Sequence, residues 1–529
     1  MNHEKILING AWETDPSEAS FTPENPATGE ELDRSYPVSS KATLARLASH
    51  AANAAKALNH CDPEQIAAFL DNHASNIDSR REEISSLCHR ETGLPTKPRL
   101  QQVEMDRTVD QLRQAAACAR DRSWCQPRID TKLDLRSVYE PLGGGVLVIG
   151  PNNFPLAYNG IAGGDFAAAI AARNPVIAKA HPLHPGTTKM LAECAHDAAK
   201  QAGLPAGSVQ MFYNCEPEDG LSLIRMPEIS AVGFTGSRPA GLSMKQAADE
   251  TGTPIYLELS SVNPMFLLPG AIEERGEDIA DLIADSMLAA SGQQCTCPGL
   301  LIVRDSHATD HLIGRLRSRL AGAPHQVMLS SGGVRHLHES VQAIEALGAD
   351  RLIGGAPVEG NAARYEHTLL RTEADHFLAN SDEMQNEMFG VAALIIVCDR
   401  DEQLIECARS LEGNLTGTLH LASDTRDDEL ARAVSAVLRN RVGRLIHDAV
   451  PTGVSVNAAT VHGGPFPATG HPGFTAVGMP TTIHRFAALR CYDRVRGAFL
   501  PPELQDTPPT PSMRRMIDGV WRTGIVERA

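Results

Sequence analysis

The sequence of 529 residues lacks the features that mark several large classes of protein. It has no block of lysine and arginine residues, and its formal net charge of -17 would repel a polyphosphate backbone. No uninterrupted run approaches the ~20 apolar residues that span a bilayer, and the apolar stretch Ile6 to Ile8 is too short for a signal-peptide core. We therefore expect a cytoplasmic protein with no nucleic-acid partner and no membrane insertion.

Aromatic residues are sparse as well, at 4% of the chain, and no internal repeat or low-complexity run is present. The hydrophobic content of 42% and the charged content of 21% are otherwise typical of a globular protein. The length is sufficient for roughly three domains of ~150 residues, each with its own core.

The chain has 11 cysteines, an odd number at irregular spacing. This pattern fits reduced thiols better than a disulfide framework. Cys295 and Cys297 are close enough to form a metal-binding pair, but no second Cys/His pair with zinc-like spacing follows. We therefore expect no metal site.

Hydrophobic periodicity divides the chain into regions. Residues 1–40 resemble a hairpin-bearing lead-in, and alanine and leucine at helical spacing predict several packed helices between Lys41 and Cys118. Residues 124–141 predict an extended hairpin that reaches outside its own domain. The proline-rich segment after Leu500 predicts an extended tail with a short terminal helix.

Between Gly145 and Ser261, apolar strands alternate with helices, and residues 262–460 form a second such unit. Alternating βαβ units predict an α/β fold with parallel sheets and with ligands at the carboxyl ends of the strands. The G-x-G-x-x-G turn of a standard dinucleotide site is absent, because the first strand ends in the sequence Gly150-Pro-Asn-Asn-Phe-Pro155. The pattern predicts a nucleotide-binding architecture that is Rossmann-like, without the standard turn.

Two residues are unusual for their surroundings. Cys295 lies among glycine, amides, threonine and proline, where a turn can present a thiol, although most free cysteines are small buried hydrophobes. Glu258 interrupts the apolar strand Ile255 to Leu259. It is either a solvated residue of an edge strand or a buried carboxylate whose pKa is raised into the range of a general base.

Other candidates are weaker individually. Asn153 could donate to an oxyanion, or simply favour its turn. The glycine-bearing turn that contains Gly236 and Ser237, followed by Gly241, could hold a phosphate at a helix N-terminus, although such turns are often glycine-rich for packing alone. Lys179 at a strand end could reach a ribose or phosphate, and Glu387 could bind a sugar hydroxyl.

Five ordered motifs together resemble the aldehyde dehydrogenase superfamily from about Ile6 to Leu500. They are Pro151-Asn-Asn-Phe-Pro155, Phe234-Thr-Gly-Ser237, Leu257-Glu-Leu259, Gly292-Gln-Gln-Cys295 and Glu387-Met-Phe-Gly390. Three further stretches resemble the branch with α-ketoglutarate semialdehyde (2,5-dioxopentanoate) dehydrogenases and an NADP-dependent fatty aldehyde dehydrogenase: Lys179 to Pro182, His184 to Thr187 and Val461 to Thr469.

The resemblance implies a role for each matching residue. Cys295 would attack the aldehyde, Asn153 would hold the resulting oxyanion, and Glu258 would activate the water that hydrolyses the thioester. The implied cofactor contacts are Lys179, Gly236, Ser237, Gly241, Glu387 and Phe389.

Departures from the common pattern affect the cofactor first. Pro182 stands where many members have a glutamate that selects the 2'-hydroxyl of NAD, so NADP is favoured and NAD is possible. Val391 replaces a usual proline, Ser260-Ser261 replaces a usual glycine pair, and Asn152 replaces a common tryptophan.

The resemblance also implies the domain organisation. Residues 1–123 and 143–261 would bind NAD(P), 262–460 would form the catalytic domain, and 124–142 with 461–500 would form an oligomerisation arm, followed by a tail at 501–529. Such an arm implies a homodimer or homotetramer.

The expected reaction is non-acylating oxidation of α-ketoglutarate semialdehyde to α-ketoglutarate. Two alternatives stay open: a medium- or long-chain aliphatic aldehyde as substrate, and a non-catalytic nucleotide-binding protein of the same fold. Arg107 and Arg173 are the candidates for binding a substrate carboxylate.

Overall fold

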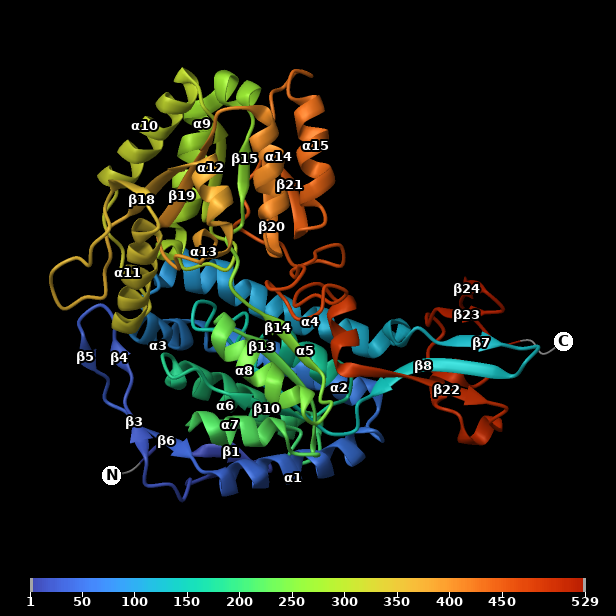
Figure 1. Cartoon of the computed structure of the whole chain (residues 1–529). Coiled ribbons are helices and arrows are strands. Elements are labelled where there is room, and N and C mark those ends of the chain that lie inside the picture. Colours follow the sequence, from blue (N-terminus) through green and yellow to red (C-terminus); the bar gives the residue numbers. More distant parts are fainter. Residues whose placement is uncertain (1–2, 527–529) are drawn as a thin grey trace.

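Three large sheets organise the computed structural model, which describes residues 3–526 (Figure 1). Two of them are seven-stranded and form the cores of two lobes, and the third is a five-stranded sheet that projects to one side as an arm. The described residues contain no helix that is both long enough and apolar enough to cross a membrane.

The first sheet has the strand order β14-β13-β9-β10-β11-β1-β2. The five strands from β14 to β11 are parallel, as their continuous apolar runs predicted, whereas β1 runs antiparallel to β11. In sequence order, β10 and β11 are added to one side of β9, and β13 and β14 are then added to its other side. A parallel sheet with this reversal of order has a ligand crevice at the carboxyl ends of its central strands. The strands are β1 (Ile6–Ile8), β2 (Ala11–Glu13), β9 (Gly145–Ile149), β10 (Val176–Lys179), β11 (Val209–Phe212), β13 (Ile229–Thr235) and β14 (Ile255–Glu258).

Helices cover this sheet, and their buried alanine and leucine faces confirm the periodicity that predicted them. They are α1 (Lys41–Leu58), α2 (Pro63–Ser79), α3 (Arg81–Thr92), a π-helical turn (Thr96–Glu104), α4 (Met105–Asp121), α5 (Gly164–Ala171), α6 (Pro185–Ala202), α7 (Pro217–Ile224) and α8 (Arg238–Asp249). Small sheets lie beside them, formed by β3 (Ser20–Phe21), β6 (Tyr36–Ser39) and β12 (Asn214–Cys215), and by β4 (Glu24–Asn25) and β5 (Glu30–Glu31).

The second seven-stranded sheet has the order β17-β18-β19-β16-β15-β20-β21 and is parallel except for β17. Its strands are β15 (Met265–Leu267), β16 (Leu300–Arg304), β17 (Asp350–Ile353), β18 (Thr368–Glu373), β19 (Ala392–Cys398), β20 (Asn414–His420) and β21 (Val442–His447). Its helices are α9 (Pro269–Leu288), α10 (His307–Gly322), α11 (Ser331–Ala346), α12 (Ala374–Ala379), α13 (Ser381–Met384), α14 (Asp401–Ser410) and α15 (Asp428–Leu438).

The arm joins the predicted hairpin to the C-terminal region in the order β22-β8-β7-β23-β24. Its strands are β7 (Arg128–Asp130), β8 (Leu135–Pro141), β22 (Ala487–Asp493), β23 (Arg515–Ile517) and β24 (Val520–Arg522). The extended hairpin is confirmed. The short terminal helix predicted after Pro511 is wrong, because this segment pairs through β23 with β7 and folds back as β24.

Candidate active site

The loop that carries Cys295 begins with a tight turn after α9. Ala290, Ser291 and Gly292 have φ values of +52°, +56° and +67°, so three successive residues are left-handed. A Cβ atom on Gly292 would overlap the backbone of Gly390 and Val391. Glycine is therefore required here, and the turn brings the thiol loop directly against the segment that contains Phe389.

Buried amides anchor the other side of the loop. The Asn263 amide group donates to the carbonyl oxygens of Cys295 and Cys297, both at 2.9 Å. Its own carbonyl oxygen accepts from Ser261 Oγ and Thr416 Oγ1, both at 3.0 Å. Ser261 thus has a structural reason to replace the usual glycine, since its hydroxyl is part of the network that fixes the loop. The sequence analysis missed Asn263.

Glu258 ends β14, which is the edge strand of the first sheet, yet its side chain is buried. The segment around Thr469 covers this edge: Glu258 and Thr469 form a β-bridge, and Leu259 N donates to Ala468 O at 2.8 Å. The alternative prediction, that Glu258 is a solvated residue of an edge strand, is therefore wrong. Its Oε1 is hydrogen-bonded to His462 Nε2 at 2.9 Å, whereas Oε2 has no partner among the described residues.

The expected rise in the pKa of Glu258 is wrong in direction. Burial raises this pKa. The charge and hydrogen bond of His462, together with the charge of Arg485, lower it by more than burial raises it, so the net pKa lies below its usual value. Neither contact could be seen from the strand sequence. Glu258 is therefore ionised at neutral pH, with one oxygen free to accept a hydrogen bond.

His462 connects the base to the thiol. Its Nε2 lies 3.4 Å from Cys295 Sγ and 2.9 Å from Glu258 Oε1, and potential ligand atoms of the three residues all lie within 4.8 Å of one another. These are also atoms that can coordinate a metal ion. Residues 461–469 contributed only to the family resemblance, and no role for His462 was predicted from the sequence.

The two thiols differ in their surroundings. Burial and the Glu258 carboxylate raise the pKa of Cys295 well above its usual value, and the Arg107 guanidinium opposes this rise. Burial raises the pKa of Cys297 to about 12, with a further contribution from Glu387. Cys295 is therefore a protonated thiol at neutral pH, next to the Glu258 carboxylate, which can accept its proton.

Asn153 lies in the turn after β9 and is buried beside this loop. Its amide nitrogen donates to Gln293 O at 3.0 Å, and its backbone carbonyl accepts from Arg99 Nη2 at 2.9 Å. An amide group has two hydrogens, and the second is available to a substrate oxygen. The structure therefore brings Asn153, Cys295 and Glu258 together, as the sequence analysis expected.

A cleft of about 830 Å³ opens between the two lobes at the carboxyl ends of β9, β10 and β13, and Cys295 and Glu258 line it. Lys179, Gly236, Ser237, Glu387 and Phe389 also line the cleft. Gly241 does not. It lies in α8, where a Cβ atom would overlap the Leu259 side chain, so its small size serves packing of the helix.

The cleft fits a dinucleotide. Ser237 caps α8 without a side-chain hydrogen bond to the helix, so the backbone N–H groups of the first turn can bind a phosphate. Lys179 projects into the same cleft, and burial lowers its pKa. Pro182 and His181 line this end, and the carboxylates that line the cleft, Glu258, Glu339 and Glu387, come from other elements.

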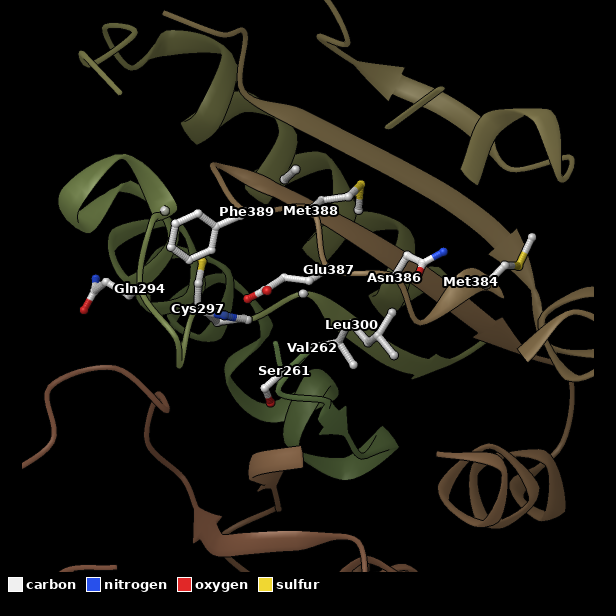
Figure 2. A pocket seen from close by; sticks show the side chains of 14 residues that line it. Ser261, Val262, Gln294, Cys297, Leu300, Met384, Asn386, Glu387, Met388 and Phe389 are labelled. Atoms are coloured by element: carbon white, nitrogen blue, oxygen red, sulfur yellow. The ribbon is translucent and has the colours of Figure 1, made fainter. Parts of the chain in front are cut away.

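Glu387 also borders a small cavity behind the cleft, where its side chain gathers with those of Phe389 and Cys297 (Figure 2). Burial raises the pKa of Glu387 to about 7, while hydrogen bonds from Ser260 and from the Ser261 backbone oppose the rise. The serine pair that departs from the common pattern thus contacts this carboxylate.

The two arginine candidates for a substrate carboxylate are separated. Arg107 lies on α4 near the thiol, with Cζ 4.9 Å from the centre of the Tyr158 ring. Arg173 instead forms an ion pair with Glu503 at 3.5 Å, near the base of the arm. The expectation for Arg173 is therefore wrong.

A half-buried thiol, a buried carboxylate and an amide donor lie beside a dinucleotide-sized cleft, an arrangement that fits an oxidoreductase with covalent catalysis. The model of the aldehyde dehydrogenase family matches residues 12–464, and the chain belongs to this family. It is therefore an enzyme that oxidises aldehydes with a nicotinamide cofactor.

Curated relatives agree with this assignment, and a solved structure shares the fold. The chain is 36% identical to α-ketoglutaric semialdehyde dehydrogenase 2 of Azospirillum brasilense over 97% of this chain and 98% of that protein. It is 34% identical to α-ketoglutaric semialdehyde dehydrogenase of Acinetobacter baylyi over 87% and 88%. The structure of lactaldehyde dehydrogenase from Escherichia coli matches with a TM-score of 0.80 at 21% identity, over 93% of this chain and 98% of that one.

Proposed function

We propose that the protein oxidises α-ketoglutarate semialdehyde to α-ketoglutarate. The observation that carries this proposal is the end-to-end similarity to two relatives that are named for this substrate, at 36% and 34% identity. The placement of Arg107 near the Cys295 thiol supports it, because the substrate carries a carboxylate at the end opposite its aldehyde.

The first step forms a carbon–sulfur bond. Cys295 transfers its proton by way of the Glu258 carboxylate to solvent and attacks the aldehyde carbon, and the carbonyl oxygen becomes an oxyanion that the free Asn153 hydrogen stabilises. Atoms of the Glu258 carboxylate and the Cys295 thiol lie within 4.8 Å of one another, which supports this route, since the thiol needs an acceptor for its proton. A nicotinamide held in the cleft by Glu387 and Phe389 would supply the acceptor for the hydride of this carbon.

The second step hydrolyses the resulting thioester. The unpaired Glu258 Oε2 accepts a proton from a water molecule, the hydroxide adds to the thioester carbon, and the carbon–sulfur bond breaks to return the thiolate. His462 holds the other carboxylate oxygen in place at 2.9 Å. Glu258 is thereby kept ionised and oriented, which is what a general base requires.

NADP is the preferred cofactor in this proposal. Lys179 supplies a positive charge at the ribose end of the cleft, and Pro182 stands beside it in place of a carboxylate that would repel a 2'-phosphate. Gly236 and Ser237 hold the pyrophosphate, and Glu387 and Phe389 hold the nicotinamide ribose and ring.

The protein assembles through the arm into a homodimer or homotetramer, because exposed apolar side chains, among them Leu489 and Trp521, cluster on the arm. The cytoplasm is the proposed compartment, because all 11 cysteines are free thiols.

The test measures reduction of NADP and NAD with α-ketoglutarate semialdehyde and with hexanal, for the wild type and for Cys295→Ala. We expect acid production without coenzyme A, a preference for the oxo acid and for NADP, and loss of turnover in the variant. Equal rates in both proteins would refute Cys295 as the nucleophile. A wild type that oxidises hexanal faster than the oxo acid would favour the aliphatic alternative. The apolar cluster of Ala157, Tyr158, Ala476 and Val477 is the feature that supports this alternative.

A further inference from the structure

We propose that Arg107, Tyr158 and Arg444 form a carboxylate-binding subsite beside Cys295 that selects aldehydes with an acidic group at the far end. The inference rests on the proposed function and deepens it, because it names the residues that recognise the acid. It is argued from three observations: where these side chains lie, which of their donors are unpaired, and how they act on the thiol.

The three residues come from different elements. Arg107 is on α4, Tyr158 follows the turn that holds Asn153, and Arg444 is on β21. The Tyr158 and His462 rings lie 6.0 Å apart, and His462 Nε2 is 3.4 Å from Cys295 Sγ. Arg107 Cζ lies 4.9 Å from the centre of the Tyr158 ring. A continuous set of contacts therefore leads from the reacting sulfur to the Arg107 guanidinium.

Each residue has a buried donor without a hydrogen-bond partner among the described residues. These atoms are Arg107 Nη2, Tyr158 Oη and Arg444 Nε. An unpaired buried donor costs about 1–3 kcal/mol, so native proteins rarely bring several together without a reason. Within the described part of the chain Arg107 forms no ion pair; its Nε donates weakly to Gln111 at 3.4 Å, and its side chain also interacts with that of Tyr158. An oxygen-rich anion would satisfy all three donors.

Electrostatics places both arginines within reach of the thiol. The Arg107 charge opposes the rise in the pKa values of Cys295 and Tyr158. Burial lowers the pKa of Arg444, and Cys295 and Tyr158 counteract this. Arg107 and Arg444 thus both act on Cys295 and Tyr158, and an anion bound beside these two side chains would be attracted by both positive charges.

The subsite is separate from the cofactor cleft. Residues that line the cleft include the cations Lys179 and Arg238, but Arg107, Tyr158 and Arg444 are not among them. The anion that these three donors would bind is therefore not the cofactor phosphate. A carboxylate on the aldehyde itself is the ligand that the proposed reaction brings to this position.

The experiment compares 5-oxopentanoate with pentanal, two aldehydes of equal chain length that differ in the terminal carboxylate. The ratio of their kcat/KM values is measured for the wild type, Arg107→Met and Arg107→Lys. Arg113→Met is the matched control, because Arg113 is an exposed arginine on the same helix. Melting temperatures verify folding.

We expect the wild type to prefer 5-oxopentanoate, and Arg107→Met to reduce the ratio about 10- to 100-fold, chiefly through KM, which is the range for a hydrogen bond to a charged group. Arg107→Lys should retain part of the ratio, and Arg113→Met should retain all of it. The ratio is the informative quantity because loss of Arg107 also alters the thiol, and this affects both aldehydes equally.

An unchanged ratio in a folded Arg107→Met protein would overturn the subsite, as would a wild type that uses both aldehydes equally well. A wild type that oxidises neither aldehyde would instead contradict the proposed function. If Arg107→Met does not fold, Tyr158→Phe serves in its place, since it removes the unpaired hydroxyl and keeps the ring. A severalfold smaller ratio supports the subsite, and an unchanged one rejects it.

Discussion

At the scale of single residues, one histidine determines how the thiol and the base work together. His462 Nε2 lies beside both Cys295 and Glu258, so its N–H keeps the carboxylate ionised and can also stabilise the thiolate once the thiol has lost its proton. Glu258 acts on the thiol in the opposite sense, because its negative charge raises the pKa of Cys295. The two neighbours should therefore have opposite effects on thiol reactivity.

The first residue-scale prediction compares Glu258→Gln with His462→Gln. Loss of the Glu258 charge lowers the pKa of Cys295, so alkylation by iodoacetamide at pH 8 should become faster, about tenfold for each pKa unit removed. Steady-state turnover should nevertheless fall about 10²- to 10⁴-fold, because the general base for hydrolysis is lost. His462→Gln should instead slow alkylation, since the thiolate loses the imidazole N–H that lies 3.4 Å from its sulfur.

The control for this pair is His60→Gln, which changes an exposed histidine. In all four proteins alkylation should rise with pH, because the thiolate that reacts forms only as pH approaches the raised pKa of Cys295. Alkylation that slows in Glu258→Gln would show that Glu258 does not hold the thiol protonated.

What the sequence predicted at this scale has a clear physical limit. Cys295, Glu258 and Asn153 stand out from their local sequence, and the structure brings them together. The direction of the pKa shift of Glu258 depends on His462 and Arg485. Both lie more than 200 positions after Glu258 in the chain, so no local sequence pattern predicts these contacts. Gly241 shows the same limit, because its glycine is needed for a contact with Leu259.

At the scale of elements, the turn from α9 into the thiol loop fixes the position of Cys295, the proposed nucleophile. Gly292 lies at a φ of +67° and packs against the Gly390 backbone, so it joins the thiol loop to the segment of Glu387 and Phe389. A side chain at this position would displace both parts of the site together.

Gly292→Ala should therefore destabilise the protein by about 1–3 kcal/mol and lower both alkylation of Cys295 and turnover. The matched control is Gly314→Ala, because Gly314 lies in α10 at an exposed position where an added Cβ meets no atom within 4 Å. Alanine is favoured over glycine in a helix by about 0.8–1.0 kcal/mol, so this control should melt at the same or a higher temperature. Gly292→Ala with wild-type melting and full activity would contradict the role of the turn.

Elements were predicted well where hydrophobic periodicity is strong. The parallel strands β9, β10 and β13 and the helices before them follow their apolar patterns closely. The tail was predicted poorly, because β23 and β24 have three residues each and are stabilised by pairing with β7. Such short strands depend on a partner that is distant in sequence.

At the scale of the whole molecule, the arm is the part that the two lobes leave uncovered. It projects beside the lower lobe and carries the C-terminal strands (Figure 1). Leu489 on β22 is 54% exposed and Val520 on β24 is 61% exposed, and β22 is an edge strand. Apolar side chains on a free sheet edge are typical of a surface that another chain covers.

We predict that Leu489→Asp shifts the wild-type dimer or tetramer toward smaller species, because a buried carboxylate at an interface is costly to desolvate. Mass is measured by light scattering on a sizing column at several protein concentrations. Leu282→Asp is the matched control, because Leu282 is an exposed leucine on α9, outside the arm, and should keep the wild-type mass. A monomeric wild type, or the same mass for all three proteins at every concentration, would show that this face of the arm does not hold the copies together.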